Sequence, residues 1–418
     1  MKIAPGTPVR VSLDFGSGNV VPVGRIALVN GVGALGYEAS FRAGGLTINP
    51  YDPIPSDDRA ILAKNPRAFA NLHGVFADSL PDAWGEILMR RRAERADIAY
   101  GTLTALDRLA AVGRTGMGAL IYEPEIGLSG KHSASIDLDA LSADAMAVLE
   151  GRAGALLDQL SRLGGSPGGA RPKILVGLDA ENNLRAGEAD LPAEFEHWLV
   201  KFRAPADPVD AGRVEAAYAE MARAAGVDIS PTKLIETPHG PGYFATRRFD
   251  RDGNARYHLL SFAGMLDSEW HVPTLDYADA LSLVRLVTAR DDDVERMVRR
   301  MFFNVVAHNR DDHAKQHAFI MDSRGVWRLA PAYDLTFAGG PGGEHYLAVA
   351  GYGKDITKKR LLNVAEEQIG ALRSAAALAR VVDAVGNFGT IAKRFDVSKR
   401  TSREIESAIA PMLKEMQE

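Results

Sequence analysis

The chain of 418 residues changes its hydrophobic pattern along its length. Residues 1 to about 50 hold three alternating or apolar runs, VRVSLDF, GRIALVN and LGYEASF, separated by glycine and asparagine, as is typical of short strands. From about Tyr257 onward, apolar residues recur mostly at helical spacing, with one or two short strands expected within residues 326–351. This order predicts an α+β fold in which a strand-rich part precedes a helical part.

One predicted helix is followed directly by a cluster of charged and polar residues. The run DDDVERMVRRMFFNVVAH places apolar residues from Val294 to Val306 at the i, i+3, i+4, i+7 spacing of a buried helix face. Its first three aspartates suit the positive end of the helix dipole. Directly afterwards comes NRDDHAKQ, Asn309 to Gln316, which is dense in charged and polar groups. A solvated surface run is the alternative, but such a run rarely follows at once on so apolar a helix, so we interpret the cluster as functional.

Composition excludes several classes of protein. With 46% hydrophobic and 25% charged residues and a net charge of −5, the chain resembles an ordinary globular protein of two or three domains. It has no cysteine and no apolar run of the ~18 residues that a membrane span needs, and its first residues lack a signal-peptide core. We therefore expect a cytoplasmic protein without a membrane partner. The mildly acidic balance argues against broad nucleic-acid binding, apart from a local basic patch at residues 90–92.

Two further segments carry candidate chemistry. LGGSPGGARPKILVGL, residues 163–178, has glycines that would let backbone N–H groups approach a phosphate, although a flexible hairpin turn explains it equally well. It matches neither the Walker A loop nor GxGxxG. HWLVKFRAP reads as a buried strand with a single lysine, Lys201, which either meets a partner inside or points to solvent from the opposite face.

Phosphoryl transfer needs these groups in a particular combination. The reaction requires a glycine-rich cover for phosphates, a strand lysine, a carboxylate for the incoming hydroxyl, and oxygen ligands for Mg²⁺. Asn309-Arg310-Asp311, with Gln316 five residues on, has the spacing of the protein-kinase catalytic loop H-R-D-x-x-x-x-N with two substitutions. Asp334 follows 23 positions after Asp311, past a predicted strand, where a metal-binding aspartate is expected. Glycine loop, Lys201, Asp311 and Asp334 thus occur in kinase order.

A family resemblance extends this interpretation. The strings FADSLPDAWGEILMRRR, SPGGARPKILV, WLVKF, ATRRFDR, NRDDHAKQHAFI and LAPAYDLTF resemble the HipA family of serine/threonine kinases, the toxins of bacterial HipA/HipB toxin–antitoxin pairs. The resemblance runs from about Phe76 through the helical tail. It implies a protein-kinase-like two-lobed fold: an N-terminal HipA-type subdomain at 1–125, a kinase N-lobe at 126–255 and an all-helical C-lobe at 256–418.

The resemblance also implies roles for individual residues. Asp311 would be the catalytic base, with His313 and Lys315 as accompanying catalytic-loop residues, and Asp334 with Gln316 would hold Mg²⁺. The implied ATP-binding residues are Gly168, Gly169, Ala170, Arg171, Lys173, Lys201, Arg247, Phe249 and Tyr333.

Ser166 matches the serine that the family autophosphorylates, a modification associated with ejection of the loop and loss of activity. The added phosphate, of ~1.5 to 2 negative charges, would be repelled by an acidic site. The implied partners are a HipB-like helix-turn-helix antitoxin, DNA indirectly through it, and a protein substrate such as an aminoacyl-tRNA synthetase or another translation component.

One position departs from the family, which mostly has asparagine where this chain has Gln316. The longer side chain moves the amide by about one methylene, so weakened metal binding is expected, and Asp312 is a candidate to compensate.

Three alternatives stay open. The first is a catalytically weak kinase homologue that mainly holds a DNA-binding antitoxin. The second is a metal-dependent phosphohydrolase built on His308, Asp311, Asp312 and His313, although the His-Asp dipeptide of the HD type is missing. The third is a small-molecule kinase, which shares the same chemistry.

Overall fold

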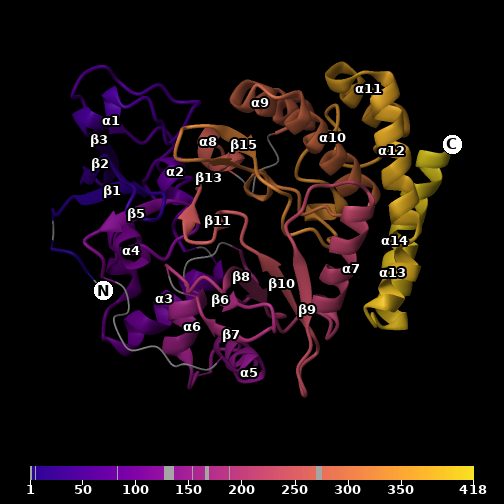
Figure 1. The fold of residues 1–418 in the computed structure, drawn as a ribbon, viewed down its shortest axis with the longest axis horizontal. Coiled ribbons are helices and arrows are strands. Elements are labelled where there is room, and N and C mark those ends of the chain that lie inside the picture. The colour runs from indigo at the N-terminus through magenta and orange to yellow at the C-terminus, as the bar shows by residue number, and fades with distance from the viewer. Residues whose placement is uncertain are drawn as a thin grey trace.

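The computed structural model describes residues 2–4, 6–81, 83–126, 136–152, 154–164, 169–187, 189–269 and 275–418. Figure 1 shows a strand-rich half in indigo and magenta and a helical half in orange and yellow, with the last helices farthest from the N-terminus. The predicted order, strands first and helices second, is confirmed.

The N-terminal part is built on an antiparallel five-stranded sheet in the order β4-β3-β2-β1-β5. Its strands are β1 (Val9–Asp14), β2 (Val20–Val29), β3 (Val32–Tyr37), β4 (Ile61–Leu62) and β5 (Leu120–Glu123). The third predicted strand, LGYEASF, is only half right, because the chain turns into a helix after Tyr37. That turn buries Phe41 and stacks its ring on Tyr37 at 5.7 Å between centroids.

The described residues of this part of the chain also form five helices. They are α1 (Ala39–Ala43), α2 (Gly74–Ala77), α3 (Ala83–Arg95), the 3-10 helix η1 (Tyr100–Thr102) and α4 (Ala105–Val112). Of these, α3 packs on the second sheet. A capping box begins α4: the Thr104 hydroxyl accepts from the Asp107 amide, and the Asp107 carboxylate accepts from the Thr104 amide.

The second unit is another antiparallel sheet, in the order β7-β6-β8-β10-β9. Its strands are β6 (Lys173–Leu178), β7 (Leu184–Ala186), β8 (Glu196–Lys201), β9 (Thr232–Ile235) and β10 (Tyr243–Arg247). Trp198 and Val200 pack on α3, α5 (Leu138–Leu149) and α6 (Leu157–Gly164). Phe244 packs on α7 (Ala211–Ala224), so this sheet has helices on both faces.

The C-terminal part is mainly helical. Its helices are α8 (Phe262–Leu266), α9 (Tyr277–Thr288), α10 (Asp291–Val306), η2 (Ala314–Gln316), η3 (Pro341–Gly343), α11 (Lys358–Ile369), α12 (Ala371–Gly386), α13 (Phe388–Arg394) and α14 (Lys399–Gln417). The helix predicted to precede the polar cluster is confirmed as α10.

This part is not made of helices alone, which corrects the all-helical expectation. A three-stranded sheet, β13 (His258–Ser261), β14 (Ala318–Met321) and β15 (Trp327–Leu329), pairs segments far apart in sequence. The small ribbon β11 (Arg251–Asp252) and β12 (Ala255–Arg256) precedes it. The short strand expected within residues 326–351 is confirmed as β15, whereas β13 and β14, of four residues each, were not predicted because such short runs show too little periodicity.

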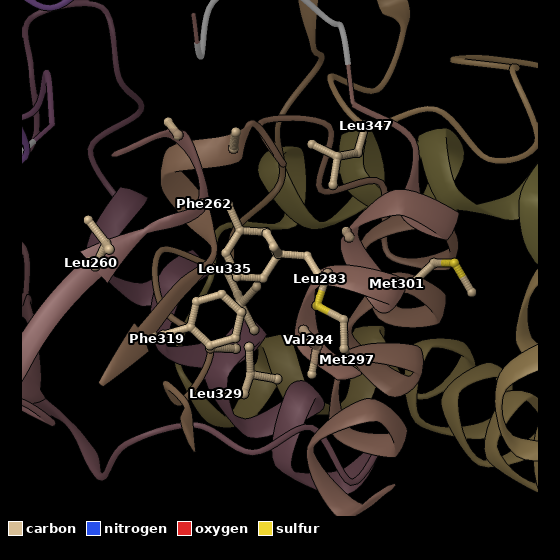
Figure 2. Packing of buried hydrophobic residues seen from close by; sticks show 14 of the residues in the cluster. Leu260, Phe262, Leu283, Val284, Met297, Met301, Phe319, Leu329, Leu335 and Leu347 are labelled. Carbon is tan, nitrogen blue, oxygen red and sulfur yellow. The ribbon is translucent and has the colours of Figure 1, made fainter. Parts of the chain in front are cut away.

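A core joins this sheet to α9 and α10. Phe262 stacks on Phe319 with ring centroids 4.8 Å apart, and Met297 and Leu335 lie in the same buried cluster (Figure 2). Leu335 follows Asp334 directly, so the core fixes the backbone beside that aspartate.

Among the described helices, none combines the length and apolar character that crossing a bilayer would demand.

Candidate active site

Lys201 lies at the end of β8, on the face of the second sheet that α7 covers. Its ammonium contacts the carboxylates of Glu215 and Asp334, and its side chain is 11% exposed. The alternative in which Lys201 points to solvent is therefore wrong. Burial opposes the charged ammonium, but the two carboxylates outweigh it and raise the pKa of Lys201.

Glu215 comes from the first turns of α7, whose apolar side packs on the sheet. The neighbouring Val214 and the residues at 217, 218 and 221 are buried, which fixes the helix and points Glu215 toward β8. Burial raises the pKa of Glu215 in spite of the attraction of Lys201. No role was predicted for Glu215 from the sequence. The signal was available, because a lysine in a buried strand requires a counter-charge.

Asp334 lies in the segment after β15 with a left-handed backbone, φ 58°. A non-glycine residue in this conformation is uncommon and needs support from its surroundings. Here the buried Leu335 and the contact with Lys201 provide that support. Burial acts against the carboxylate, but Lys201 and Lys173 together hold the pKa of Asp334 well below its usual range, so it is ionised at neutral pH.

Asp311 and Gln316 face Asp334 from the loop that follows α10. The Gln316 Nε2 donates to Asp334 Oδ2 over 2.9 Å. Burial and the negative charge of Asp334 raise the pKa of Asp311 to about 6, and Gln316 opposes this rise. The loop thus places Asp311 and Gln316 near Asp334, as the predicted site requires.

Asp312 points the other way, into the core, and is fully buried. Its carboxylate accepts from the Tyr277 hydroxyl at 2.7 Å and from the Tyr346 amide at 2.9 Å, and lies 2.9 Å from His345 Nδ1. Asp312 therefore supports the loop from inside. The expectation that it could compensate for Gln316 as a local metal carboxylate is wrong, because all these contacts hold it away from Asp334.

His313 and Lys315 accompany Asp311 in the loop. The His313 Nε2 lies 3.7 Å from Asp311 Oδ1 and the imidazole packs edge-on against Tyr346. Burial lowers the pKa of His313 to about 4, so at neutral pH this contact is no ion pair. Lys315 lies in η2, and its carbonyl accepts from the Tyr333 hydroxyl at 2.6 Å.

The described part of the glycine-rich loop approaches the two strand lysines. Lys173 lies directly opposite Lys201 across the β6–β8 pair and is buried. Gly169 has φ 107°, a backbone conformation that favours glycine, and it lies against the flexible end of the Lys173 side chain. Ser166 and Gly168 lie outside the described residues, and Ala170 is exposed.

Arg171 follows in the same loop. Its guanidinium makes two hydrogen bonds to Asp207, from Nε at 2.8 Å and from Nη2 at 3.0 Å, which is the fork geometry of a well-oriented pair. These bonds, together with the more distant Asp334 and Glu215, raise the pKa of Arg171. Asp207 was missed in the sequence, where nothing near it marks it.

The remaining candidate ATP-binding residues do not all lie at the site. Phe249 stacks on Tyr333, with ring centroids 5.5 Å apart and ring planes at 25°. Tyr333 immediately precedes Asp334 in the chain. Arg247 pairs in register with Trp198, so alternation places it on the sheet face opposite Lys201, where it binds Glu196 at 2.8 Å. The structure thus brings Phe249 and Tyr333 toward the site and does not bring Arg247.

The donor set fits a hard divalent cation. Asp334 offers carboxylate oxygens and Gln316 an amide whose oxygen becomes available on a flip about its terminal bond, and Mg²⁺ prefers one or two such ligands completed by water and phosphate. Lys173, Lys201 and Arg171 supply positive charge beside them for a phosphate chain. The residues present are therefore compatible with ATP and Mg²⁺.

Two family models match the chain. The HipA-like C-terminal domain matches residues 165–410, more than half of the chain, and the HipA N-terminal domain matches residues 19–123. The chain belongs to the HipA family. A protein of Sinorhizobium fredii named as the kinase Y4mE is 29% identical over 132 residues, and the match covers 29% of this chain and only 31% of that protein.

One solved structure shows the same fold. The HipA family member from Shewanella oneidensis MR-1, solved as a toxin–antitoxin complex of HipA, HipB and operator DNA, is similar with a TM-score of 0.67 and 13% sequence identity. That similarity covers 96% of this chain and 95% of the other. The Helicobacter pylori proinflammatory kinase CtkA gives a TM-score of 0.38 at 15% identity, over 59% of this chain and 91% of that one.

Proposed function

We propose that this HipA-family protein is an ATP- and Mg²⁺-dependent serine/threonine protein kinase that acts as the toxin of a toxin–antitoxin pair. The observation that carries the proposal is the position of Lys201, which contacts both Glu215 and Asp334. Gln316 donates to the same Asp334, whose negative charge acts on Asp311. Phosphoryl transfer needs a phosphate-binding cation, a metal carboxylate and a base within one site.

The residues divide the chemistry between them. Asp311, with its pKa raised to about 6, is mostly ionised at neutral pH and is a better proton acceptor than an ordinary aspartate, so it would take the proton of the attacking hydroxyl. Lys201 and Lys173 would bind phosphate oxygens, and Asp334 with Gln316 would hold Mg²⁺. When bound, Mg²⁺ supplies charge neutralisation at the transferring phosphate.

Loss of activity through Ser166 belongs to the same proposal. Ser166 belongs to the segment between α6 and Gly169, close in sequence to the loop that passes Lys173. A phosphate adds ~1.5 to 2 negative charges, which the carboxylates of Asp311, Asp334 and Glu215 would repel from the site. We expect Ser166→Ala to remain active after incubation with ATP under conditions that inactivate the unaltered chain, with phosphorylation followed by mass spectrometry.

The partners follow from family membership and fold. The structural similarity to a HipA solved with HipB and operator DNA supports a HipB-like helix-turn-helix antitoxin as the partner, with DNA reached through it. The substrate is proposed as a protein hydroxyl. An aminoacyl-tRNA synthetase or another translation component is the prediction that the family resemblance makes.

The positions of Asp312 and His308 argue against the phosphohydrolase alternative. Asp312, one of its four residues, is sequestered in the core, and His308 packs against Phe337. Within the described ranges no group of three or more His, Cys, Asp or Glu side chains is arranged to hold a metal. The weak homologue that only holds an antitoxin keeps one supporting feature, the glutamine at position 316.

Expression in a bacterial host tests the proposed function. The unaltered chain should arrest growth, co-expression of a cognate antitoxin should relieve the arrest, and Asp311→Ala, made in the otherwise complete chain, should not arrest growth. Phosphoproteomics of the arrested cells would identify the substrate. Equal arrest by Asp311→Ala would support toxicity through binding alone and contradict the kinase.

A further inference from the structure

A buried network of arginines and aspartates lies between the two sheets, directly beside Phe249. We call it the arginine network and define it as Asp14, Arg248, Asp250, Arg251 and Arg256, with the backbone carbonyls of residues 114, 116 and 118. Each of its five side chains is at most 8% exposed. Buried charges of this kind are costly unless their partners are held in good geometry, so the network fixes its surroundings.

Asp250 is the centre of the network and has no exposed surface. It accepts two hydrogen bonds from Arg248, at 2.9 and 2.7 Å, and one from Arg251 at 2.6 Å. It also accepts the backbone N–H of Gly118 at 2.7 Å. Burial acts against the carboxylate, but Arg248 and Arg251 outweigh it and hold the pKa of Asp250 well below its usual range.

The N-terminal part provides the other acceptors. Arg251 donates to the carbonyls of Gly116 at 3.2 Å and Gly118 at 3.0 Å, and Arg256 donates to Gly118 at 3.0 Å. Arg256 also reaches Asp14 of β1 at 3.3 Å. These carbonyls belong to the segment that leads into β5, so the first sheet satisfies guanidinium groups that the second unit carries.

Phe249 stands between two members of this network. Arg248 and Asp250 flank it in sequence, and the Arg248 backbone N–H donates to the His197 carbonyl of β8 at 2.9 Å. The backbone on both sides of Phe249 is therefore held, and its ring stacks on Tyr333, whose hydroxyl binds the Lys315 carbonyl. A continuous path runs from Asp250 through the adjacent Phe249 to Tyr333, the residue before Asp334.

We infer that Asp250 is a positioning residue for the base-binding end of the nucleotide site, and that the 114–118 segment of the N-terminal part helps to hold it in place. The inference rests on the proposed function, because it takes Phe249 and Tyr333 as the aromatic surface that a purine ring would contact. The inference gives the first sheet a role, because the segment that leads into β5 would complete the nucleotide site of the kinase part.

The test compares ADP with inorganic tripolyphosphate, both with Mg²⁺, by calorimetry on the full chain. Tripolyphosphate keeps the phosphate contacts and lacks the base. For Asp250→Asn we expect the affinity for ADP to fall about tenfold or more, as for loss of a base-stacking contact, and the affinity for tripolyphosphate to change less than about twofold. Asp57→Asn, in an exposed pair with Arg59, is the matched control and should change neither affinity.

Because Asp250 is fully buried, Asp250→Asn can fail to fold, and circular dichroism will show this. Asp14→Asn then decides by the same criterion, since it weakens the network at its outer end and should reduce ADP affinity selectively. The inference is overturned if the folded variants bind ADP like the unaltered chain, or lose ADP and tripolyphosphate alike. If the unaltered chain binds neither ligand, the proposed function itself fails.

Discussion

Gln316 Nε2 donates a hydrogen bond to Asp334 Oδ2 over 2.9 Å, although most of the family is expected to have asparagine at this position. The additional methylene has not removed the amide from Asp334, the carboxylate that we propose holds Mg²⁺. Gln316 also favours the charged form of Asp311. The glutamine therefore lies where the proposed function requires a second metal ligand.

This contact predicts how Mg²⁺ dependence responds to substitution. Gln316→Ala removes the amide, and we expect the Mg²⁺ concentration for half-maximal activity to rise about tenfold or more. Gln316→Asn keeps an amide nearby and should change that concentration by no more than about threefold. Titration of phosphate transfer against Mg²⁺ measures both. A large gain on Gln316→Asn would instead show that the glutamine impairs metal binding.

The adjacent aspartates predict opposite effects on stability. Asp312→Ala leaves the Tyr277 hydroxyl and the Tyr346 amide without their buried acceptor, so we expect the free energy of unfolding to fall by about 3 kcal/mol. Asp311→Ala should leave it unchanged or slightly higher, because the raised pKa of Asp311 shows that the fold disfavours its charge. Urea denaturation at neutral pH measures both.

The pKa of Asp312 predicts how its contribution to stability depends on pH. Despite burial, His345 and the hydrogen bonds lower the pKa of Asp312 below its usual value. Its stabilisation is then fully present above the unfolded pKa of about 3.9 and is lost as pH falls through the lower folded value. The stability difference between the unaltered chain and Asp312→Ala should therefore persist at pH 5. Equal stability of the two chains there would show that Asp312 is not the support described.

Lys201→Met tests the buried cation. Without the ammonium, Glu215 and Asp334 face each other across a buried site, so we expect stability to fall by about 3 kcal/mol and phosphate transfer to fall on the order of 100-fold. Lys414→Met, at an exposed position in α14, is the matched control and should alter neither. Unfolding curves and ATP turnover are the measurements, and full turnover by Lys201→Met would remove Lys201 from the phosphate site.

The pKa of Asp311, the proposed base, predicts how kcat/KM depends on pH. Asp311 has a pKa of about 6, so kcat/KM, which reports groups of the free enzyme, should fall as pH drops through 6. Asp334, with its pKa well below its usual range, stays ionised throughout and should add no second step there. Initial rates at limiting ATP from about pH 5 to 8 test this. A profile that stays flat down to pH 5 would argue against Asp311 as the base.

The sequence predicted those parts of the site that recur in a fixed order along the chain. Lys201, Asp311 and Asp334 could be assigned because each belongs to a short string with a recognisable neighbourhood, and α10 because its apolar face is unbroken. Glu215 was visible but had no assigned partner, since only the packing of α7 on the sheet brings it to Lys201. Its role was inferable from the need of a buried lysine for a counter-charge.

Other features could not be derived locally. Which of two consecutive aspartates faces the site depends on Tyr277 and His345, which lie 35 and 33 residues away. Arg247 was assigned together with Phe249, but strand alternation turns it to the opposite face of the sheet. The arginine network connects segments 132 to 242 residues apart, a separation at which spacing in the sequence carries no information.

The central claim is that NRDDHAKQ is the catalytic loop of a working kinase. The most direct measurement is transfer of ³²P from γ-labelled ATP with Mg²⁺ to the protein itself and to a cell extract, for the unaltered chain and for Asp311→Ala. The structure predicts labelling by the unaltered chain and its loss in Asp311→Ala, with ATP binding retained. Absence of labelling by folded, unaltered protein that binds ATP, or equal labelling by Asp311→Ala, would contradict the claim.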